Sequence, residues 1–337
     1  MKIPFELLLV LGLFPFAPSL GVAQVKCDSQ LPTFRFQEKG ISGKIQSVGS
    51  DTMNSLMLLW GARFKEGYPS VRFEIDGAGS SKAIPALIAG ADFGPTSRPL
   101  KETEVRDFES RYEYAPTLVP TCMDLVAILV HRDNPIEKLA LQDLDAIFSS
   151  TRVTGGRRSI TQWGQLGVHG SFEAAPISMF GRNAASGTYG FFKERVLGNG
   201  DFKDTVSEQP GATSVVQAVG TLKYAIGYGG VGHRTESVRV VPLSRDENSL
   251  PYLPTYEHVL NDEYPLSRFL YIAINLDPKQ KRLDPLRREF IKFILSRDGQ
   301  EIVADEGYFP IDSGRAMKIL SDLGIESEKR NDKATSE

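Results

Sequence analysis

An isolated arginine stands four residues before a serine in the segment FGRNAASGTYGFFKERVLG, residues 180–198. Ser186, Gly187 and Thr188 follow Arg182 directly before an amphipathic run that predicts a helix ending near Leu197. The unpaired amides and the dipole at a helix N-terminus attract anions, and a guanidinium fork fits a tetrahedral oxyanion. The segment therefore predicts an oxyanion site. The alternative for Arg182 is a surface ion pair with a carboxylate.

Three further turns share this composition. They are GSDT at 49–52, GSS at 79–81 and TSR at 96–98, each expected to end a strand and to open a helix. In an open α/β sheet such turns gather at the carboxyl ends of the strands, where ligands bind. Any one of them could be an ordinary helix cap. Four together, with Arg182 beside one, favour a shared site.

Composition excludes several functional classes. The 337 residues carry a net charge of −3, which disfavours nucleic acid and anionic membranes as partners. Four histidines, scattered singly, offer no metal-ligand spacing, so we expect no metal and no cofactor. No G-x-S-x-G or H-E-x-x-H motif occurs, and no histidine lies in a serine turn, so no catalytic residue is expected. The GYGGVG match at 227–232 precedes a strand rather than the helix that a dinucleotide site needs.

The elements that must position these turns alternate between helix and strand. Apolar spacing predicts a helix after Asp51 and a strand at 71–76, and the region after 283 reads as one long helical stretch to 309. This order implies α/β lobes. Two long apolar strands, near 123–130 and 265–274, flank a middle block, so we expect the first lobe to contain both chain ends and a hinge to lie between the lobes.

The expected domain plan follows from these patterns. It comprises a cleavable signal peptide at 1–23, an N-terminal extension at 24–40, a first lobe at 41–125 plus 267–325, a second lobe at 126–266, and a disordered tail at 326–337. An uncleaved N-terminal anchor is the alternative for the first segment. Whether Cys27 and Cys122 form a disulfide stays open, because spacing alone does not decide it.

Several ordered motifs resemble the periplasmic phosphate-binding proteins of bacterial ABC transporters. They are the three serine turns, GRNAASGTYGFFKE, DAIFSSTR, ITQWGQLG, EQPGATSVVQAV and AIGYGGVG, and they span roughly residues 41–315. The resemblance implies a type II periplasmic-binding-protein fold: α/β, two-lobed, with mixed sheets flanked by helices and two hinge strands. It also implies a monomer that binds inorganic phosphate in the periplasm and delivers it to ABC permease subunits in the inner membrane.

The resemblance assigns phosphate-binding roles position by position. The expected ligand residues are Asp51, Thr52, Ser80, Ser97, Arg182, Ser186, Gly187 and Thr188.

Two positions depart from the family pattern. Ser97 stands where the pattern has an aspartate that accepts the proton of hydrogen phosphate, and Asp51 stands where a threonine or serine hydroxyl is usual. We therefore expect Asp51 to supply the carboxylate from the opposite side of the cleft, which would favour a protonated anion over sulfate. The alternatives are that Asp51 only caps a helix and points away, and that Lys82 or Arg98 compensates its charge. At the level of function, the alternatives are another oxyanion, such as sulfate or molybdate, or a ligand-free adhesion or scaffold protein.

Overall fold

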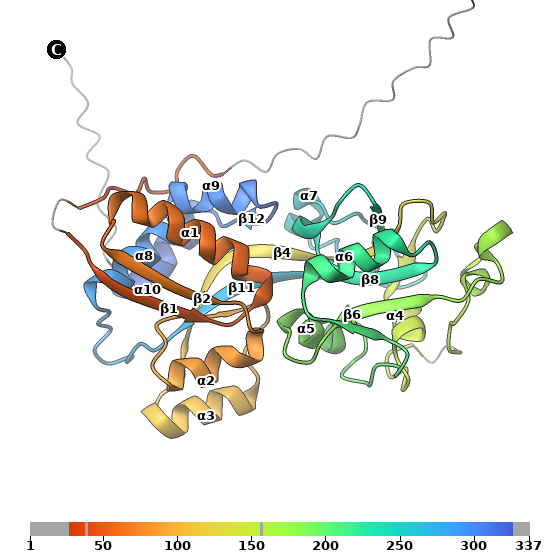
Figure 1. The fold of residues 1–337 in the computed structure, drawn as a ribbon, viewed down its shortest axis with the longest axis horizontal. Helices are drawn as coiled ribbons and strands as arrows, with labels where there is room; N and C mark the ends of the chain where they lie inside the picture. Colours follow the sequence, from red (N-terminus) through yellow and green to blue (C-terminus); the bar gives the residue numbers. More distant parts are fainter. Residues whose placement is uncertain (1–26, 38–39, 156–157, 326–337) are drawn as a thin grey trace, which may run out of the picture.

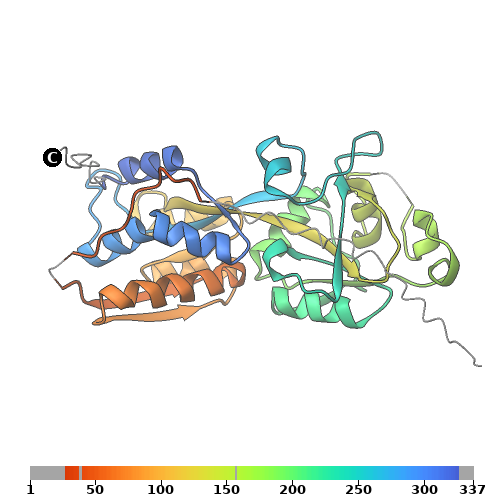
Figure 2. The ribbon, with the colours of Figure 1, turned by 90° about the horizontal axis from the view of Figure 1, so that it is seen from above.

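The computed structural model describes residues 27–37, 40–155 and 158–325. The expected signal peptide, residues 24–26 and 38–39 of the expected N-terminal extension, and the expected tail lie outside this part. Within the described residues, none of the helices combines the length and the apolar character that crossing a membrane requires. Figures 1 and 2 show two lobes side by side, joined by extended strands.

The strands carry the labels of Figure 1. They are β1 (Gly43–Val48), β2 (Val71–Asp76), β3 (Gly94–Thr96), β4 (Thr117–His131), β5 (Leu139–Ala140), β6 (Ser178–Arg182), β7 (Ser207–Gln209), β8 (Ala225–Gly230), β9 (Val238–Val241), β10 (Leu243–Ser244), β11 (Ser267–Ile274) and β12 (Phe309–Pro310).

The α-helices are α1 (Asn54–Gly67), α2 (Ala83–Ile88), α3 (Glu102–Tyr112), α4 (Leu141–Phe148), α5 (Gly187–Arg195), α6 (Ala212–Thr221), α7 (Tyr256–Leu260), α8 (Pro285–Ile294), α9 (Arg297–Asp305) and α10 (Ser313–Asp322). Short 3₁₀ helices are η1 (Asp51–Met53), η2 (Ser80–Lys82), η3 (Trp163–Leu166), η4 (Gly170–Phe172) and η5 (Val231–His233).

One long strand, β4, runs through both lobes. The main sheet has the order β3-β11-β4-β8-β6-β7, with β4 antiparallel to β11 on one side and to β8 on the other. Residues 117–125 of β4 pair with β11, and residues 126–130 pair with β8. The sheet mixes parallel and antiparallel neighbours, because β6 is parallel to both β7 and β8. The expected mixed α/β architecture is therefore present.

Each lobe has its own apolar core. One cluster of buried residues includes Trp60, Phe64, Phe290 and Phe293 and packs α1 against α8, while the other lies within the chain from 125 to 266 and adds Phe309. These clusters define the first and the second lobe, respectively. Buried aromatic side chains supply much of the apolar area that stabilises each lobe.

The N-terminal extension packs on the first lobe where it is described. Leu31 is 3% exposed. The ring of Phe34 lies edge-on to the rings of Phe36 and Phe293, with centroid distances of 5.1 and 5.3 Å, respectively. Cys27 and Cys122 are free thiols in the structure.

Two sequence expectations about helices are wrong. The TSR turn does not open a helix, because α3 begins only at Glu102, after Lys101. The stretch after 283 is not one helix: α8 ends at Ile294, and the Ser296 hydroxyl accepts the Gly299 amide as the N-cap of α9. A serine that competes for backbone donors favours such a break.

Candidate anion-binding site

Arg182 ends β6 at the edge where the parallel strands β6, β7 and β8 finish. Its side chain is 1% exposed although it is charged. Nη2 forms an ion pair with Asp51 Oδ2 at 3.0 Å and donates to the Pro210 carbonyl at 3.0 Å. Nε and Nη1 are buried and have no partner among the described residues. Two buried donors of a cation are thus free to bind an acceptor.

The electrostatic surroundings of Arg182 mix opposing charges. Burial lowers the pKa of the Arg182 guanidinium, Asp51 opposes this effect, and the positive charge of Arg268 lowers the pKa further. Arginine nevertheless stays protonated at neutral pH, because its ordinary pKa lies so high. The Tyr228 hydroxyl accepts the Arg182 amide at 3.3 Å and helps to hold the end of the strand.

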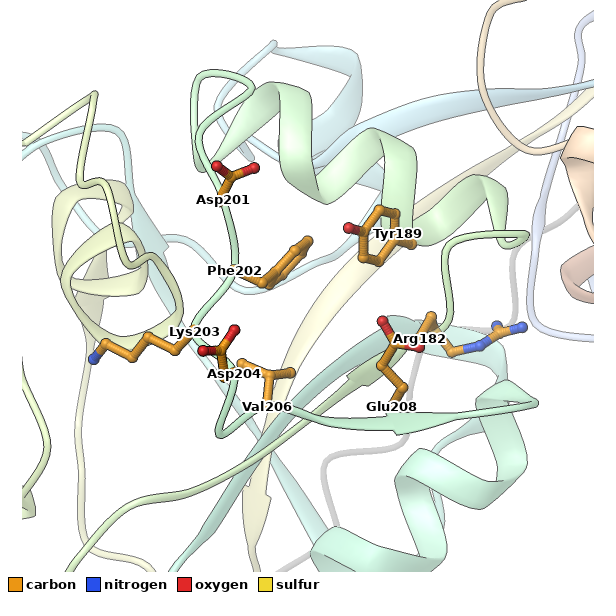
Figure 3. Close-up of a pocket in the computed structure, with 8 residues that line it drawn as sticks. All are labelled: Arg182, Tyr189, Asp201, Phe202, Lys203, Asp204, Val206 and Glu208. Carbon is orange, nitrogen blue, oxygen red and sulfur yellow. The ribbon is translucent and has the colours of Figure 1, made fainter.

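Figure 3 shows a pocket in the second lobe, next to Arg182. It is lined by Arg182, Tyr189, Asp201, Phe202, Lys203, Asp204, Val206 and Glu208. The guanidinium of Arg182 points away from the other labelled side chains, toward the first lobe. The donors of Arg182 therefore face the space between the lobes rather than this pocket.

The turn after β6 caps α5. Ser186 is the N-cap, and its Oγ accepts the amides of Thr188 at 3.1 Å and Tyr189 at 3.4 Å. Because Oγ accepts these bonds, its own hydrogen remains available to donate. The amide of Gly187, at the first helical position, has no intrahelical acceptor.

Gly187 lies against two hydroxyls of the first lobe. A Cβ at this position would lie 2.3 Å from Ser80 Oγ and 2.3 Å from Ser97 Oγ. These two oxygens are 3.3 Å apart, both side chains are fully buried, and the Ser97 amide donates to Ser80 Oγ at 3.1 Å. Only glycine allows the start of α5 to approach the serines this closely.

Thr52 and Thr188 complete the contact between the lobes. Their hydroxyl oxygens are 3.1 Å apart, and both residues are buried. The amide of Ser81 also donates across the gap to the carbonyl of Ala185 at 3.2 Å. The structure thus brings all eight sequence-predicted residues together where the lobes meet.

Asp51 does not serve as a cap that points away. Ser50 is the N-cap of η1, and the Asp51 carboxylate faces the second lobe, where it contacts Arg182 and accepts the Ala212 amide at 3.4 Å. Lys82 is exposed, and Arg98 is held by Glu104 at 2.6 Å, so the partner of Asp51 is Arg182.

Sequence reasoning missed Arg268 and Asp124. Arg268 donates to Asp124 Oδ2 from Nη2 at 2.6 Å and to Thr188 Oγ1 at 2.9 Å. The available signal was one lone charge of each sign in two long apolar strands, SRFLYIAI and MDLVAILV. Lone charges in buried strands are expected to pair.

The chemistry of this arrangement is that of a binding site. Amides, hydroxyls and a guanidinium converge from both lobes, and the described residues hold no group of three or more His, Cys, Asp or Glu suited to a metal. Such uncharged donors around one guanidinium suit a small oxyanion.

Known proteins resemble this chain over most of its length. The model of the PBP superfamily domain matches residues 36–298. The phosphate-binding protein PstS of Pseudomonas aeruginosa is 46% identical over 299 residues, covering 88% of this chain and 92% of that protein. PstS of Staphylococcus aureus (strain MRSA252) is 26% identical and covers 87% of each chain.

A solved structure agrees in fold. A substrate-binding protein assigned to a phosphate ABC transporter of Clostridium perfringens, solved with bound phosphate, superposes with a TM-score of 0.67 at 27% identity, covering 80% of this chain and all of that one. These relatives are named as a phosphate-binding protein and as the substrate-binding protein of an ABC transporter, and not as enzymes. The chain belongs to the PBP superfamily and, within it, to the family of the phosphate-binding protein PstS.

Proposed function

We propose that this chain binds inorganic phosphate between its two lobes. The observation that carries the proposal is the pair of unpartnered donors on buried Arg182, which is paired with Asp51 of the first lobe. The start of α5, a few residues further along the chain, meets the hydroxyls of Ser80 and Ser97. Charge-assisted hydrogen bonds from a guanidinium are the strongest that a protein offers to a phosphate oxygen. The names of the relatives support phosphate over other oxyanions.

We further propose that the bound phosphate is delivered to an ABC permease. In this proposal a signal peptide directs the chain to the periplasm, where it acts as a monomer. The lobes, 41–125 plus 267–325 and 126–266, open and close about β4 and β11. Closure follows binding because the anion bridges donors on both lobes.

Calorimetric titration of the mature protein, freed of carried-over ligand, tests the binding proposal. We expect one phosphate per chain, no heat with sulfate or molybdate, and loss of phosphate binding in R182A. Arg239→Ala is the matched control, because this arginine lies on β9 and donates to the Asn134 and Ile136 carbonyls, away from the predicted ligand residues. Heat with sulfate alone would assign the site to another oxyanion. If none of the anions gives a heat of binding, a ligand-free scaffold role would be favoured.

Asp51 supplies a finer proposal about selectivity. Its Oδ2 is engaged by Arg182, and its Oδ1 makes no hydrogen bond with the described residues. A carboxylate oxygen can accept the proton of hydrogen phosphate but repels fully ionised sulfate.

We expect D51S to weaken phosphate binding and to let sulfate compete. Calorimetric competition between the two anions measures this change, with Asp92→Ser as the control at a carboxylate outside the site. If D51S keeps both the phosphate affinity and the rejection of sulfate, the role of Asp51 is refuted while phosphate binding itself stands.

A further inference from the structure

A buried ion pair joins the two strands that run between the lobes. Arg268 on β11 lies directly opposite Asp124 on β4 in the antiparallel register. Arg268 Nε and Nη2 donate to Asp124 Oδ2 at 3.0 and 2.6 Å, and the residues are 5% and 0% exposed. The pair is therefore buried and fixed between β4 and β11.

The same guanidinium extends to α5 of the second lobe. Its Nη2 donates to Thr188 Oγ1 at 2.9 Å, and its carbon lies 5.3 Å from the ring centre of Phe191, one turn further along the helix. Arg268 thus contacts a hinge strand and the helix that begins at the candidate site. Its Nη1 is buried and has no partner among the described residues.

These contacts set the direction of a chain of hydrogen bonds. A guanidinium only donates, so Thr188 Oγ1 must accept from Arg268. The single hydrogen of the Thr188 hydroxyl must then point elsewhere, and Thr52 Oγ1 lies 3.1 Å away. If Thr188 donates to Thr52, the hydrogen of Thr52 is in turn free to donate.

We propose that Arg268, held by Asp124, is a positioning residue of the anion site that directs the Thr188 hydroxyl to donate to Thr52, so that the Thr52 hydroxyl donates toward the anion. Arg268 donates both to the Asp124 carboxylate, which holds it in place, and to Thr188. From Arg268 onward, each hydrogen in the chain through Thr188 to Thr52 is directed away from the guanidinium. A donor oriented in this way suits an unprotonated oxygen of a phosphate. The proposal rests on the proposed function, because this hydroxyl acts on the same bound phosphate.

A double-mutant cycle tests the proposal. Phosphate affinity is measured by calorimetry for the wild type, R268M, T188V and R268M/T188V, with R239M as the control for loss of a hydrogen-bonded arginine outside the site. We expect R268M and T188V each to weaken binding about tenfold, the loss of one oriented hydrogen bond. We expect the double variant to bind no more weakly than the weaker single variant, because both changes remove one function. R239M should bind like the wild type.

Rescue separates positioning from general stability. R268K keeps the charge and one donor group, so we expect it to bind more tightly than R268M and less tightly than the wild type. If R268M does not fold, the cycle is built with R268K instead. Wild-type affinity in the arginine variants, or losses that multiply in the double variant, would overturn the proposal. Absence of phosphate binding by the wild type would instead refute the proposed function.

Discussion

The close approach of Gly187 to the first lobe makes Gly187→Ala the sharpest perturbation of the site. The new Cβ would lie 2.3 Å from Ser80 Oγ and from Ser97 Oγ. Carbon and oxygen atoms approach to about 3.3 Å, so the facing turns must separate by about 1 Å. Alanine favours a helix more than glycine does, so the second lobe itself should not be destabilised.

The separation sets the expected magnitude. The Thr52 and Thr188 oxygens, 3.1 Å apart, would move to about 4 Å, beyond hydrogen-bond range. If the second lobe holds the phosphate, the donors of the first lobe would then lie too far from it to form hydrogen bonds. Each hydrogen bond to a charged group contributes about 1.5–3 kcal/mol. Losing two of them should raise the dissociation constant for phosphate by a factor of about 10² to 10⁴.

Calorimetry on G187A, with G229A as the control, measures this effect. Gly229 lies in the same lobe, and a Cβ there meets no atom within 4 Å, so G229A should bind like the wild type. Small-angle scattering with saturating phosphate should show a more open G187A than wild type. A dissociation constant for G187A equal to that of the wild type would refute the claim that the lobes must meet at this glycine.

Three further predictions concern stability, each measured by chemical denaturation. Burial lowers the pKa of His233, although nearby carboxylates oppose this effect. As the pH falls below about 6.5, this histidine therefore takes up a proton in the unfolded chain before it does so in the folded protein. The free energy of unfolding should therefore drop in this range for the wild type and less for H233Q; equal slopes would contradict this. S296A should lose about 1 kcal/mol, because the hydroxyl that accepts the Gly299 amide is removed, whereas S110A, with a hydroxyl outside any cap, should change little. F34A should lose about 2 kcal/mol if the extension packs as described, and an unchanged midpoint would contradict that packing.

The sequence allowed much of the local structure to be predicted, because local signals fix it. The strand at 71–76 and the cap at Ser186 follow from alternation and from a hydroxyl before an apolar helix, and both are observed. The break at Ser296 was missed because a helical period continues on both sides of it. The TSR turn was misread because Pro99 follows it, and α3 starts only after this proline.

The pairing of residues across the site was less accessible. Composition placed Asp51 and Arg182 in candidate turns, but their ion pair depends on how the two lobes face each other, which no local pattern encodes. Arg268 and Asp124 are 144 positions apart and meet only through the register of β4 and β11. Such contacts depend on the register between strands that are far apart in the sequence. The isolated charges in apolar strands therefore indicated that each needs a buried partner, but not which residue that partner is.

The charges around the site suggest how it distinguishes anions. Arg182 is paired with Asp51, and Arg268 is paired with Asp124, so each basic side chain at the site has one acidic partner. A site of this kind does not select by total charge, because any small anion meets the same balance. What differs between candidate anions is where each carries a hydrogen. In the proposed site, the donor oriented by Arg268 favours an oxygen without a proton, whereas the free oxygen of Asp51 favours an oxygen that carries one. An anion that presents both kinds of oxygen satisfies both sides, and hydrogen phosphate does so while sulfate does not.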